Sequence, residues 1–398
     1  MMKFLFIVVE MFVVASPCVW ATMELHASPS FNVIDYGALG NGQTDDSNAF
    51  LKAWKDACNA SYGASTLIIP KEKIFMLQPV LFHGPCKPTI LHIKIKGTIV
   101  APNNIKDWKF PESTRKAWIR FKRISGLVIR GGGLIDGQGA PWWNSYFNTE
   151  INRPTALHFS ECDNLFLSRL THINSPKNHI SINRCNGSLI TKLHIIAPNE
   201  SPNTDGIDIS QSSNIVIKNS RMETGDDCIA INHGSTFINI IGVFCGPGHG
   251  ISVGSLGKNG AHHTVEEIYV RNCTFNRTTN GVRIKTWMGG QGYARKITFK
   301  DIMLVEATNP LIIDQQYNPY DNVDAVRVSD VKYHNVRGTS SSAHAIKLHC
   351  DKTIGCTNIV LKEINITTIT GKDTYASCKN VKGVCYSCNP HVSCLSHN

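Results

Sequence analysis

Short apolar triplets recur along the chain, and each usually follows an Asn or Asp. They begin at Leu127, Leu165, Leu189, Ile215, Ile238, Ile268, Ile297, Val326 and Ile359. From Leu165 onward they recur at broadly similar intervals, and each triplet leads after a polar break into another short apolar run. Many short strands with a period slightly above twenty residues predict a solenoid in which each coil stacks on the last.

Helical periodicity is confined almost entirely to Ala49–Asn59, where Phe50, Leu51, Trp54 and Ala57 fit one or two amphipathic turns. Barrels and sandwiches would need hairpin signals, which do not flank alternating strands here. We therefore predict an all-β, single-stranded right-handed parallel β-helix with a short N-terminal helical cap. Because such a stack is quasi-one-dimensional, the 398 residues need not divide into the two or three domains that length alone suggests.

Residues 1–21 are typical of a signal peptide. An apolar run, Phe4–Ala15, is interrupted by Glu10, and Val19 and Ala21 supply small residues at positions −3 and −1 of a cleavage site. The run is too short for a membrane span, and no later stretch of about 18 apolar residues exists. We expect residues 1–21 to be removed and residues 22–398 to form one secreted, extracellular catalytic domain without a membrane partner.

Composition and charge narrow the class of partner. With 42% hydrophobic and 18% charged residues, the chain is neither disordered, collagen-like nor a coiled coil. The net charge is +10, and the stretch from Lys71 to Arg130 holds thirteen Lys or Arg against three Asp or Glu. Such a segment attracts nucleic acid or an acidic polysaccharide, although a solvated basic surface explains it equally well. No nucleic-acid-binding module is recognisable, so we expect no nucleic-acid partner.

Fourteen cysteines support an oxidising compartment. Cys18 leaves with the signal peptide, so at least one of the remaining thirteen is unpaired. Close spacing suggests local disulfides within the pairs Cys350/Cys356 and Cys228/Cys245. Cys385 and Cys388 could hold zinc, but a disulfide is favoured in a secreted chain. Six glycosylation sequons predict a glycoprotein, at Asn59, Asn186, Asn199, Asn272, Asn276 and Asn365.

Four polar clusters fall inside the repeat, namely Asn203–Asp205, Gly225–Asp227, Gly248–Gly250 and Arg283–Lys285. Asp205, Asp227 and His249 are equally spaced along the sequence, at an interval close to the period of the repeat. In a solenoid of that coil length, such residues lie above one another at about 4.8 Å, the spacing of paired strands. Arg283 and Lys285 are two apart on a strand-like segment and share a face. The spacing therefore predicts two carboxylates and an imidazole in a stack, with two cations in the same repeat.

These groups suit acid–base hydrolysis of an acidic sugar polymer. Closely packed acids cannot all ionise easily, so one keeps its proton at mildly acidic pH while its neighbours stay charged. That asymmetry supplies the general acid and general base of glycoside hydrolysis. Arg283 and Lys285 suit a substrate with a carboxylate on each residue. His249, flanked by glycines, is placed to tune or share the proton of the acid.

Each cluster taken alone has a simpler interpretation. Asp226-Asp227 is common in turns, a single His249 is more often structural, and Arg283 with Lys285 is usually a solvated face. The equal spacing of Asp205, Asp227 and His249, together with basic partners, argues against coincidence. Three Asp and one His could also bind a cation, but no ligand pair such as His-x-x-x-His supports that hypothesis. We expect no metal and no cofactor.

The clusters resemble the signature of polygalacturonases, the pectin-hydrolysing family of inverting glycoside hydrolases. The matching segments are Asn203–Gly206, Gly225–Cys228, Cys245–Gly250 and Arg283–Lys285. The wider stretch Gly246–Gly257 looks like the plant branch, of the pollen type, and Phe31–Ala38 is also typical. The resemblance covers nearly the whole mature chain and implies the same right-handed parallel β-helix.

The resemblance also implies roles for individual residues. Asp226 would protonate the glycosidic oxygen, while Asp205 and Asp227 would activate the attacking water. The implied catalytic set is Asp205, Asp226, Asp227 and His249, and the implied substrate-binding set is Asn203, Arg283, Lys285 and Tyr317. Cys228 and Cys245 resemble a family disulfide that brackets the site.

The expected function is that of a secreted, monomeric polygalacturonase that hydrolyses α-1,4-galacturonosyl bonds of pectin with inversion, exo action being favoured over endo. One geometric tension accompanies this prediction. Stacked coils would place carboxylates about 5 Å apart, a separation associated with retention, whereas inversion usually needs about 6.5–9.5 Å. The side chains at Gly225–Asp227 must therefore splay at their corner.

Two alternatives stay open on sequence alone. A pectate lyase shares the architecture and the acidic polymer, but it uses calcium and an Arg base rather than acids that share a proton. A pectin-binding β-helix without turnover is the other alternative. It is disfavoured because three clustered carboxylates do not help to bind a polyanion.

Overall fold

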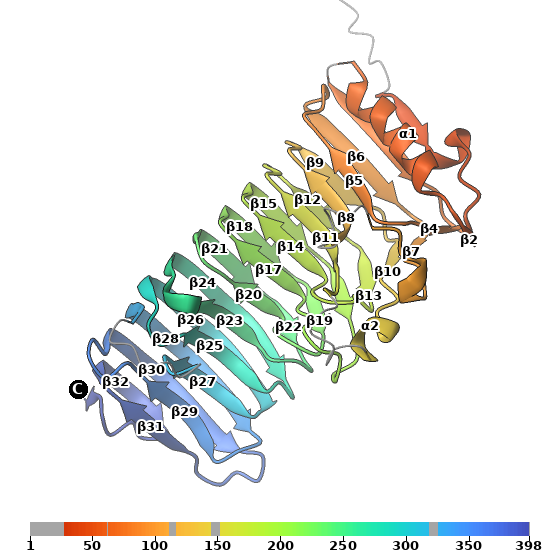
Figure 1. Cartoon of the computed structure of the whole chain (residues 1–398). Coiled ribbons are helices and arrows are strands. Elements are labelled where there is room, and N and C mark those ends of the chain that lie inside the picture. Colours follow the sequence, from red (N-terminus) through yellow and green to blue (C-terminus); the bar gives the residue numbers. More distant parts are fainter. Residues whose placement is uncertain (1–27, 62, 111–116, 145–151, 318–324, 398) are drawn as a thin grey trace, which may run out of the picture.

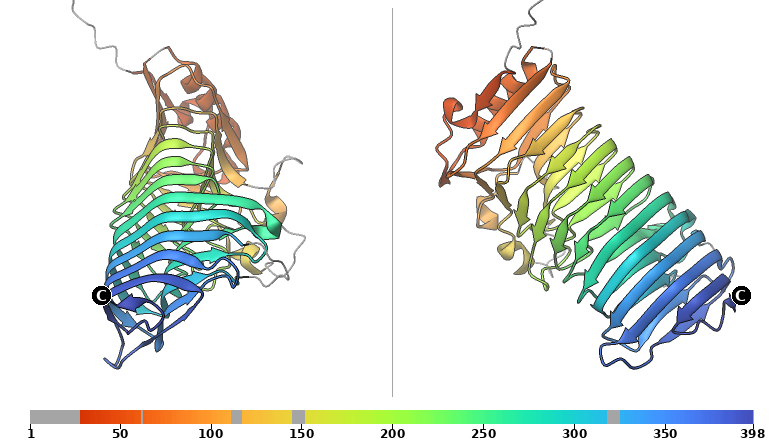
Figure 2. Two further views of the ribbon diagram at one scale, coloured as in Figure 1. Left: turned by 90° about the vertical axis from the view of Figure 1, so that its left-hand side faces the viewer. Right: turned by 180° about the vertical axis from the view of Figure 1, so that it is seen from behind.

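The structure, a computed structural model, describes residues 28–61, 63–110, 117–144, 152–317 and 325–397. Their strands form one continuous elongated stack with the described N-terminal residues at one end and the C-terminus at the other (Figures 1 and 2). Every strand pairing is parallel, and one coil follows the next along the stack. The prediction of a right-handed parallel β-helix is confirmed. The predicted signal peptide lies outside the described residues.

One face of the stack is an 11-stranded sheet, called sheet 1 here, which faces the viewer in Figure 1. In chain order its strands are β5 (Val80–His83), β8 (Ala117–Lys122), β11 (Thr155–Ser160), β14 (Ile180–Asn183), β17 (Ile207–Ser210), β20 (Ile229–Ile231), β23 (Ile251–Leu256), β25 (Asn280–Thr286), β27 (Asn309–Asp314), β29 (His344–His349) and β31 (Tyr375–Lys379).

The other strands of the described chain form sheet 2, which wraps the remaining sides of the stack. They are β1 (Ser30–Asn32), β2 (Asn41–Asp45), β3 (Ala64–Ile69), β4 (Ile74–Met76), β6 (Ile90–Ile95), β7 (Thr98–Val100), β9 (Leu127–Arg130), β10 (Leu134–Asp136), β12 (Phe166–Ser168), β13 (Thr171–Ile173), β15 (Asn186–Thr191), β16 (His194–Ile196), β18 (Ser213–Lys218), β19 (Arg221–Glu223), β21 (Ser235–Ile241), β22 (Phe244–Cys245), β24 (His262–Asn276), β26 (Gln291–Ala307), β28 (Arg327–Ser340), β30 (Cys356–Thr368), β32 (Val381–Asn389) and β33 (Ser396–His397).

Helices are few in the described chain: α1 (Ser47–Asn59), α2 (Ala140–Asn144) and the short 3-10 turns Val33–Tyr36, Ile105–Asp107 and Lys258–Gly260. Helix α1 covers the N-terminal end of the stack (Figure 1). Its Phe50 ring lies 5.4 Å from that of Phe75, and its Trp54 ring lies 5.1 Å from that of Phe82. The predicted helical cap is therefore confirmed. No helix in the described ranges has both the length and the apolar character needed to cross a bilayer.

Aliphatic ladders fill the interior. Along sheet 1, inward positions of successive coils pair directly and none of them is accessible to solvent; they are Ile182, Ile209, Ile231, Val253, Ile284, Ile313 and Leu348. Because successive strand side chains point to opposite faces, the residues between them point outward. The recurring apolar triplets of the sequence supply the corresponding inward rows of sheet 2, where buried Ile215 pairs with Ile238 and Ile238 pairs with Ile268.

Five disulfides join described cysteines. Those expected from close spacing are present, Cys228–Cys245, Cys350–Cys356 and Cys385–Cys388. Two further disulfides, Cys58–Cys86 and Cys378–Cys394, had no sequence signal. Three buried cysteines in the described chain are unpaired, namely Cys162, Cys185 and Cys273, which agrees with an odd number in the mature chain.

Two histidines interrupt the apolar interior. His172 occupies an inward row between Ile135 and Ile195, and its Nδ1 lies 3.2 Å from Nδ1 of His179. Burial lowers the pKa of His172 from 6.5 to about 3, and burial followed by the charge of His172 lowers the pKa of His179 well below its usual value. The Nε2 atoms of both rings are buried with no hydrogen-bond partner in the described structure.

This histidine pair should make the fold acid-sensitive. Below pH 6.5 the unfolded chain protonates these histidines while the folded chain does not, so stability is lost as pH falls from 6.5 towards about 3. His172→Leu fits the aliphatic row and removes one of the two groups. We expect the melting temperature of the variant to fall less steeply than that of the native chain over this range. If the melting temperatures of the variant and the native chain fell equally with pH, the histidine pair would not be the cause of the acid sensitivity.

Candidate active site

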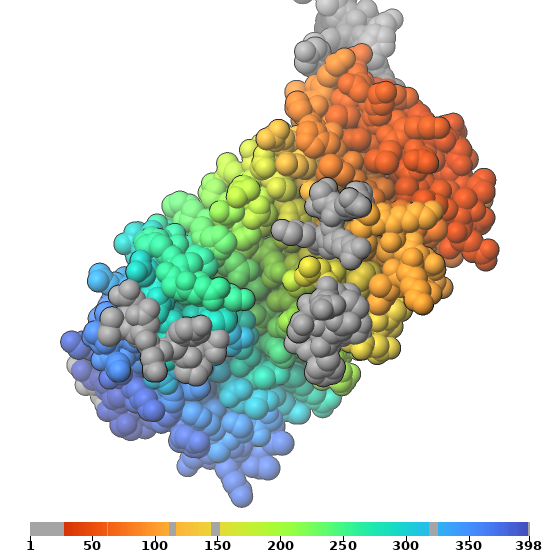
Figure 3. All heavy atoms as spheres, viewed as in Figure 1, coloured from red at the N-terminus to blue at the C-terminus, as the bar shows by residue number. Residues whose placement is uncertain are grey.

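The site forms at one corner of the stack, where short strands of sheet 2 turn into sheet 1. Asp205 lies between β16 and β17, Asp226 and Asp227 lie between β19 and β20, and His249 lies between β22 and β23. The amide of Gly206 donates to the carbonyl of Asp227 (2.9 Å). In a space-filling view, the green middle coils of this face are recessed between the N-terminal turns and the teal turns (Figure 3).

The register predicted from the equal spacing is present. In the strands that follow the turns, Ile207 pairs with Ile229 and Ile229 pairs with Ile251. Each of these isoleucines stands two positions after one of the predicted residues. Asp205, Asp227 and His249 therefore occupy equivalent turn positions in three successive coils.

The polar residues of the corner form two hydrogen-bonded groups, and Asp226 is the centre of the first. Its Oδ1 accepts hydrogen bonds from His249 Nδ1 (2.9 Å) and from the backbone N–H of Asp227 (2.8 Å), and its Oδ2 accepts from Asn203 Nδ2 (3.2 Å). Its side chain is 16% exposed and that of His249 is 39% exposed, so solvent reaches both. Burial raises the pKa of Asp226, but the hydrogen bond and charge of His249 and the Asp227 N–H outweigh it, so the pKa lies below its usual value.

Close backbone packing holds His249 in place. Gly250 has φ of 83°, and a Cβ at this position would lie 2.2 Å from the carbonyl oxygen of Asn280. Only glycine fits such a contact with positive φ. The glycine beside the histidine therefore allows the coil below to approach closely. From that coil the Asn280 side chain donates to the His249 carbonyl (3.1 Å).

Asp227 is the centre of the second group and is 1% exposed. Its Oδ1 accepts from Arg283 Nη2 (2.8 Å) and from Ser252 Oγ (2.8 Å), and its Oδ2 accepts from Lys285 Nζ (2.8 Å). Arg283 Nε also donates to Ser252 Oγ (3.0 Å). Both oxygens of this buried carboxylate are thus saturated by two cations and a hydroxyl, which is the arrangement a buried charge requires.

Two further acids have raised pKa values. Burial, followed by the charges of Asp208, Asp226 and Asp227, raises the pKa of Asp205 well above its usual range. Burial and the charge of Asp227 raise that of Asp208 to about 7. Asp208 also accepts a hydrogen bond from Asn178 Nδ2 (2.6 Å). The corner therefore combines ionised and proton-holding carboxyls, the asymmetry that acid–base chemistry needs.

The structure brings the predicted polar residues together and adds some that sequence reasoning missed. Asp208, Asn178 and the bonding role of Ser252 were not predicted. Asp208 and Ser252 each lie three residues beyond a predicted residue, Asp205 and His249 respectively, at outward strand positions. Strand alternation applied to the segments after each cluster could have found them.

Arg153 is a further residue without a sequence signal. Its guanidinium donates to Asn203 Oδ1 (2.6 Å), to the carbonyl of Pro176 (3.1 Å) and to the carbonyl of Pro202. It therefore ties two neighbouring turns together and orients the amide that donates to Asp226. Because Arg153 and Asn203 are 50 residues apart, only the fold reveals the contact.

Tyr317 lies beside the cationic group, as expected. Its ring centroid is 5.4 Å from Lys285 Nζ and 6.4 Å from that of Trp287, and the residue is 44% exposed. Its amide donates to the carbonyl of Thr286 (3.3 Å). The 5.4 Å distance between Lys285 Nζ and the Tyr317 ring is typical of a cation–π contact.

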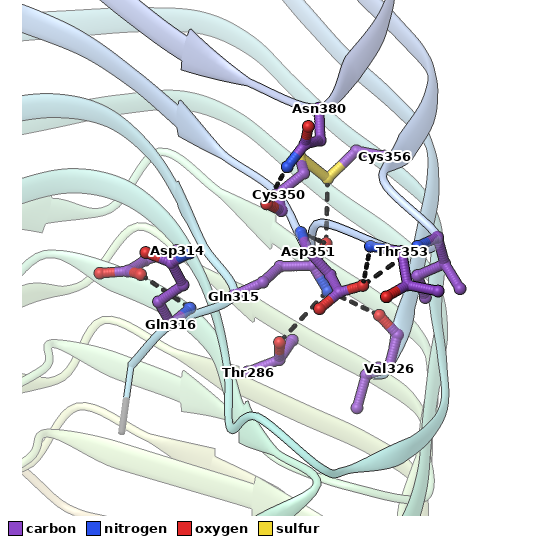
Figure 4. The surroundings of a disulfide bond; sticks show 11 residues. Thr286, Asp314, Gln315, Gln316, Val326, Cys350, Asp351, Thr353, Cys356 and Asn380 are labelled. Carbon is purple, nitrogen blue, oxygen red and sulfur yellow. Dashed lines mark hydrogen bonds between the residues drawn. A yellow bond between two sulfur atoms is a disulfide. The ribbon is translucent and has the colours of Figure 1, made fainter. Parts of the chain in front are cut away.

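Gln315 anchors the Tyr317 segment (Figure 4). This residue is 1% exposed, and its Nε2 donates to the carbonyl of Val326 (2.7 Å) and to Thr286 Oγ1 (3.3 Å). Its Oε1 accepts from the amide of Asp351 (3.2 Å), next to the Cys350–Cys356 disulfide. One buried amide thus links the end of the strand that carries Lys285 to the loop closed by the disulfide.

A metal hypothesis has some geometric support. Asp226, Asp227 and His249 each offer a ligand atom, and these atoms lie within 4.8 Å of one another. Both oxygens of Asp227 are already bound by cationic side chains, however, so a divalent ion would have to displace Lys285 or Arg283. The donor set thus fits proton transfer better than metal binding.

Comparisons with known proteins agree with this geometry. The sequence profile of glycosyl hydrolases family 28 matches residues 58–393. A probable polygalacturonase of Arabidopsis thaliana is 47% identical over 379 residues, covering 93% of this chain and 81% of that protein. A polygalacturonase of Persea americana is 43% identical, covering 90% and 78%.

A solved structure, the endo-xylogalacturonan hydrolase from Aspergillus tubingensis, superposes with a TM-score of 0.79 at 26% identity, covering 89% of this chain and 98% of that one. The family profile and the named relatives point to hydrolysis rather than β-elimination, so the lyase alternative is set aside. The chain belongs to glycosyl hydrolases family 28, as a glycoside hydrolase of the polygalacturonase family.

Proposed function

We propose that the protein hydrolyses α-1,4-galacturonosyl bonds of pectin or polygalacturonate by single displacement, with inversion at the anomeric carbon. The observation that carries the proposal is the division of the corner into two groups. Asp226 with His249 is partly exposed, whereas Asp227 is buried between Arg283 and Lys285. Two acids in different environments can take different roles in one displacement.

Asp226 is proposed as the general acid. Although its pKa is lowered by His249, a galacturonate carboxylate bound near Arg283 and Lys285 would add negative charge and raise it again. His249 Nδ1, 2.9 Å from the carboxylate, is placed to supply the proton. Asn203 holds the other carboxylate oxygen and so fixes the direction in which the acid points.

Asp205 and Asp227 are proposed to activate the attacking water. Asp205 acts as the base in its ionised form, and its raised pKa makes that carboxylate a stronger proton acceptor than an ordinary one. Asp227 keeps Arg283 and Lys285 in place through its 2.8 Å contacts, and Lys285 and Tyr317 would meet the sugar carboxylate and ring.

Exo action is proposed over endo on the resemblance to the pollen-type group. The fold alone does not decide the mode, because the Aspergillus neighbour that shares it is named an endo enzyme. We further propose that the protein is a monomeric glycoprotein secreted to the cell wall as one catalytic domain, after loss of residues 1–21. Five of its six sequon asparagines are exposed, the exception being the half-buried Asn276.

Digestion of polygalacturonate, followed by proton NMR and product sizing, tests these proposals together. The first anomer to appear should be the inverted one; initial release of the retained anomer would contradict single displacement. Monomer as the sole early product supports exo action, whereas a ladder of oligomers establishes endo action. An unsaturated, ultraviolet-absorbing product would overturn hydrolysis altogether.

A further inference from the structure

The basic segment between Lys71 and Arg130 has no part in the proposed active site. Its Lys and Arg residues lie on both sheets of the stack. Lys94 on β6 pairs with Arg130 on β9, and both belong to sheet 2. Arg120 and Lys122 lie on β8 of sheet 1, the sheet whose turns carry the proposed catalytic acids. Their neighbours Ile119 and Phe121 are buried, so Arg120 and Lys122 point outward.

One outward row of sheet 1 connects Arg120 with the site. Arg120 pairs with His158, His158 with Ser181, and Ser181 with Asp208. Further along, the same row continues through Ala230 and Ser252 to Arg283. Three strand spacings separate Arg120 from Asp208, or about 14 Å along the axis of the stack.

Arg120 is half-buried, and no hydrogen bond or ion pair joins it to another residue in the described ranges. Burial, followed by the charge of Arg120, lowers the pKa of His158 to about 4, so the neighbouring ring is neutral at mildly acidic pH. By contrast Arg123, also in the basic segment, pairs with Glu161 at 3.0 Å. Arg120 is thus a partly desolvated cation whose charge is not balanced by a neighbouring carboxylate.

We propose that Arg120 binds the carboxylate of a galacturonate unit remote from the scissile bond, and so forms a distal subsite on sheet 1. The inference rests on the proposed function, because it takes the substrate to be a polymer with a carboxylate on every unit. Guanidinium groups recognise carboxylates through paired hydrogen bonds. Between Arg120 and the acids, the outward residues are polar and suit sugar hydroxyls: His158 and Ser181 lie in the same row, and Ser160 and Asn183 lie in the next.

The subsite should make affinity depend on chain length. A trimer bound across the proposed acids is too short to reach a cation three coils away, whereas a long chain lying along the axis meets it. Arg120→Gln should therefore raise the ratio of KM for polygalacturonate to KM for trigalacturonate about tenfold, the effect expected from one charge-assisted contact. Arg120→Lys, which keeps the charge but not the planar fork, should recover part of the difference.

Arg130→Gln is the matched control, since it removes the same charge from the same basic segment but from sheet 2. If both variants weaken binding equally, the segment acts only through its general field and the subsite proposal is wrong. An unchanged ratio in Arg120→Gln, or equal changes for trimer and polymer, would also overturn it. Thermal unfolding of each variant reports whether the fold is retained.

Binding measured by calorimetry on an Asp226→Asn background separates this inference from the proposed function. Loss of length-dependent binding on adding Arg120→Gln supports the subsite even if the native chain releases no reducing ends. If the native chain hydrolyses the polymer but Arg120→Gln does not change binding, the proposed function stands and the subsite proposal is wrong.

Discussion

Asp226→Asn is expected to lower kcat on polygalacturonate by about 10²–10⁴-fold, because an amide cannot donate the proton that the leaving oxygen needs. The fold should survive. The Asn oxygen can still accept from His249 Nδ1 and from the Asp227 amide, and only the 3.2 Å contact with the Asn203 amide turns from attractive to repulsive. Release of reducing ends measures the loss, and calorimetry measures retained binding.

Asp163→Asn is a suitable control, since it removes an exposed carboxylate from a turn between β11 and β12, away from the proposed acids. The control should keep the native rate. An Asp226→Asn variant with more than a tenth of the native kcat would remove Asp226 from the role of acid. A native chain that binds pectin without releasing reducing ends would establish the non-catalytic alternative.

Asp227→Asn is expected to abolish activity and also to destabilise the fold by about 3–5 kcal/mol, the usual cost of leaving a buried charge without its partner. Arg283 and Lys285 are 14% and 10% exposed and both bond to this carboxylate. The free energy of unfolding in urea and reducing-end release together measure the two effects.

A second substitution distinguishes charge imbalance from misfolding. Adding Lys285→Met to Asp227→Asn removes one uncompensated cation and should recover part of the stability without recovering activity. The matched control is Glu306→Gln, which breaks the exposed Arg277–Glu306 pair and should cost about 1 kcal/mol or less. Equal costs for Asp227→Asn and Glu306→Gln would show that the buried group contributes no more than a surface pair.

Much of the fold follows from sequence because a solenoid converts spacing into position. The apolar triplets became inward rows of sheet 2, and the two equal steps from Asp205 to His249 became three equivalent turns. Contacts that cross the coils in other ways carry no such signal. Arg153 reaches Asn203 over 50 residues, and the pairing of Cys58 with Cys86 depends on how the first coil closes under α1.

The electrostatics of the site were the least predictable part. The sequence clusters named three acids and two cations. They did not indicate that Asp227 would form ion pairs with both Arg283 and Lys285, or that the pKa values of Asp205 and Asp208 would be raised. That division depends on burial and on which outward row each side chain joins. Arg283 shares its row with Asp208 and Ser252, whereas Lys285 lies one outward row further along β25.

The parallel register of sheet 1 also acts as a ruler for a polymeric substrate. Each outward row repeats once per coil at about 4.8 Å, so a change at one row position alters the surface met by the chain at a fixed distance from the cleavage point. Preference for length, charge pattern or esterification can then be adjusted coil by coil while the three turns from Asp205 to His249 stay as they are. In a stack of this kind, one set of coils determines where the polymer is cleaved, and other coils determine how many of its sugar units are bound.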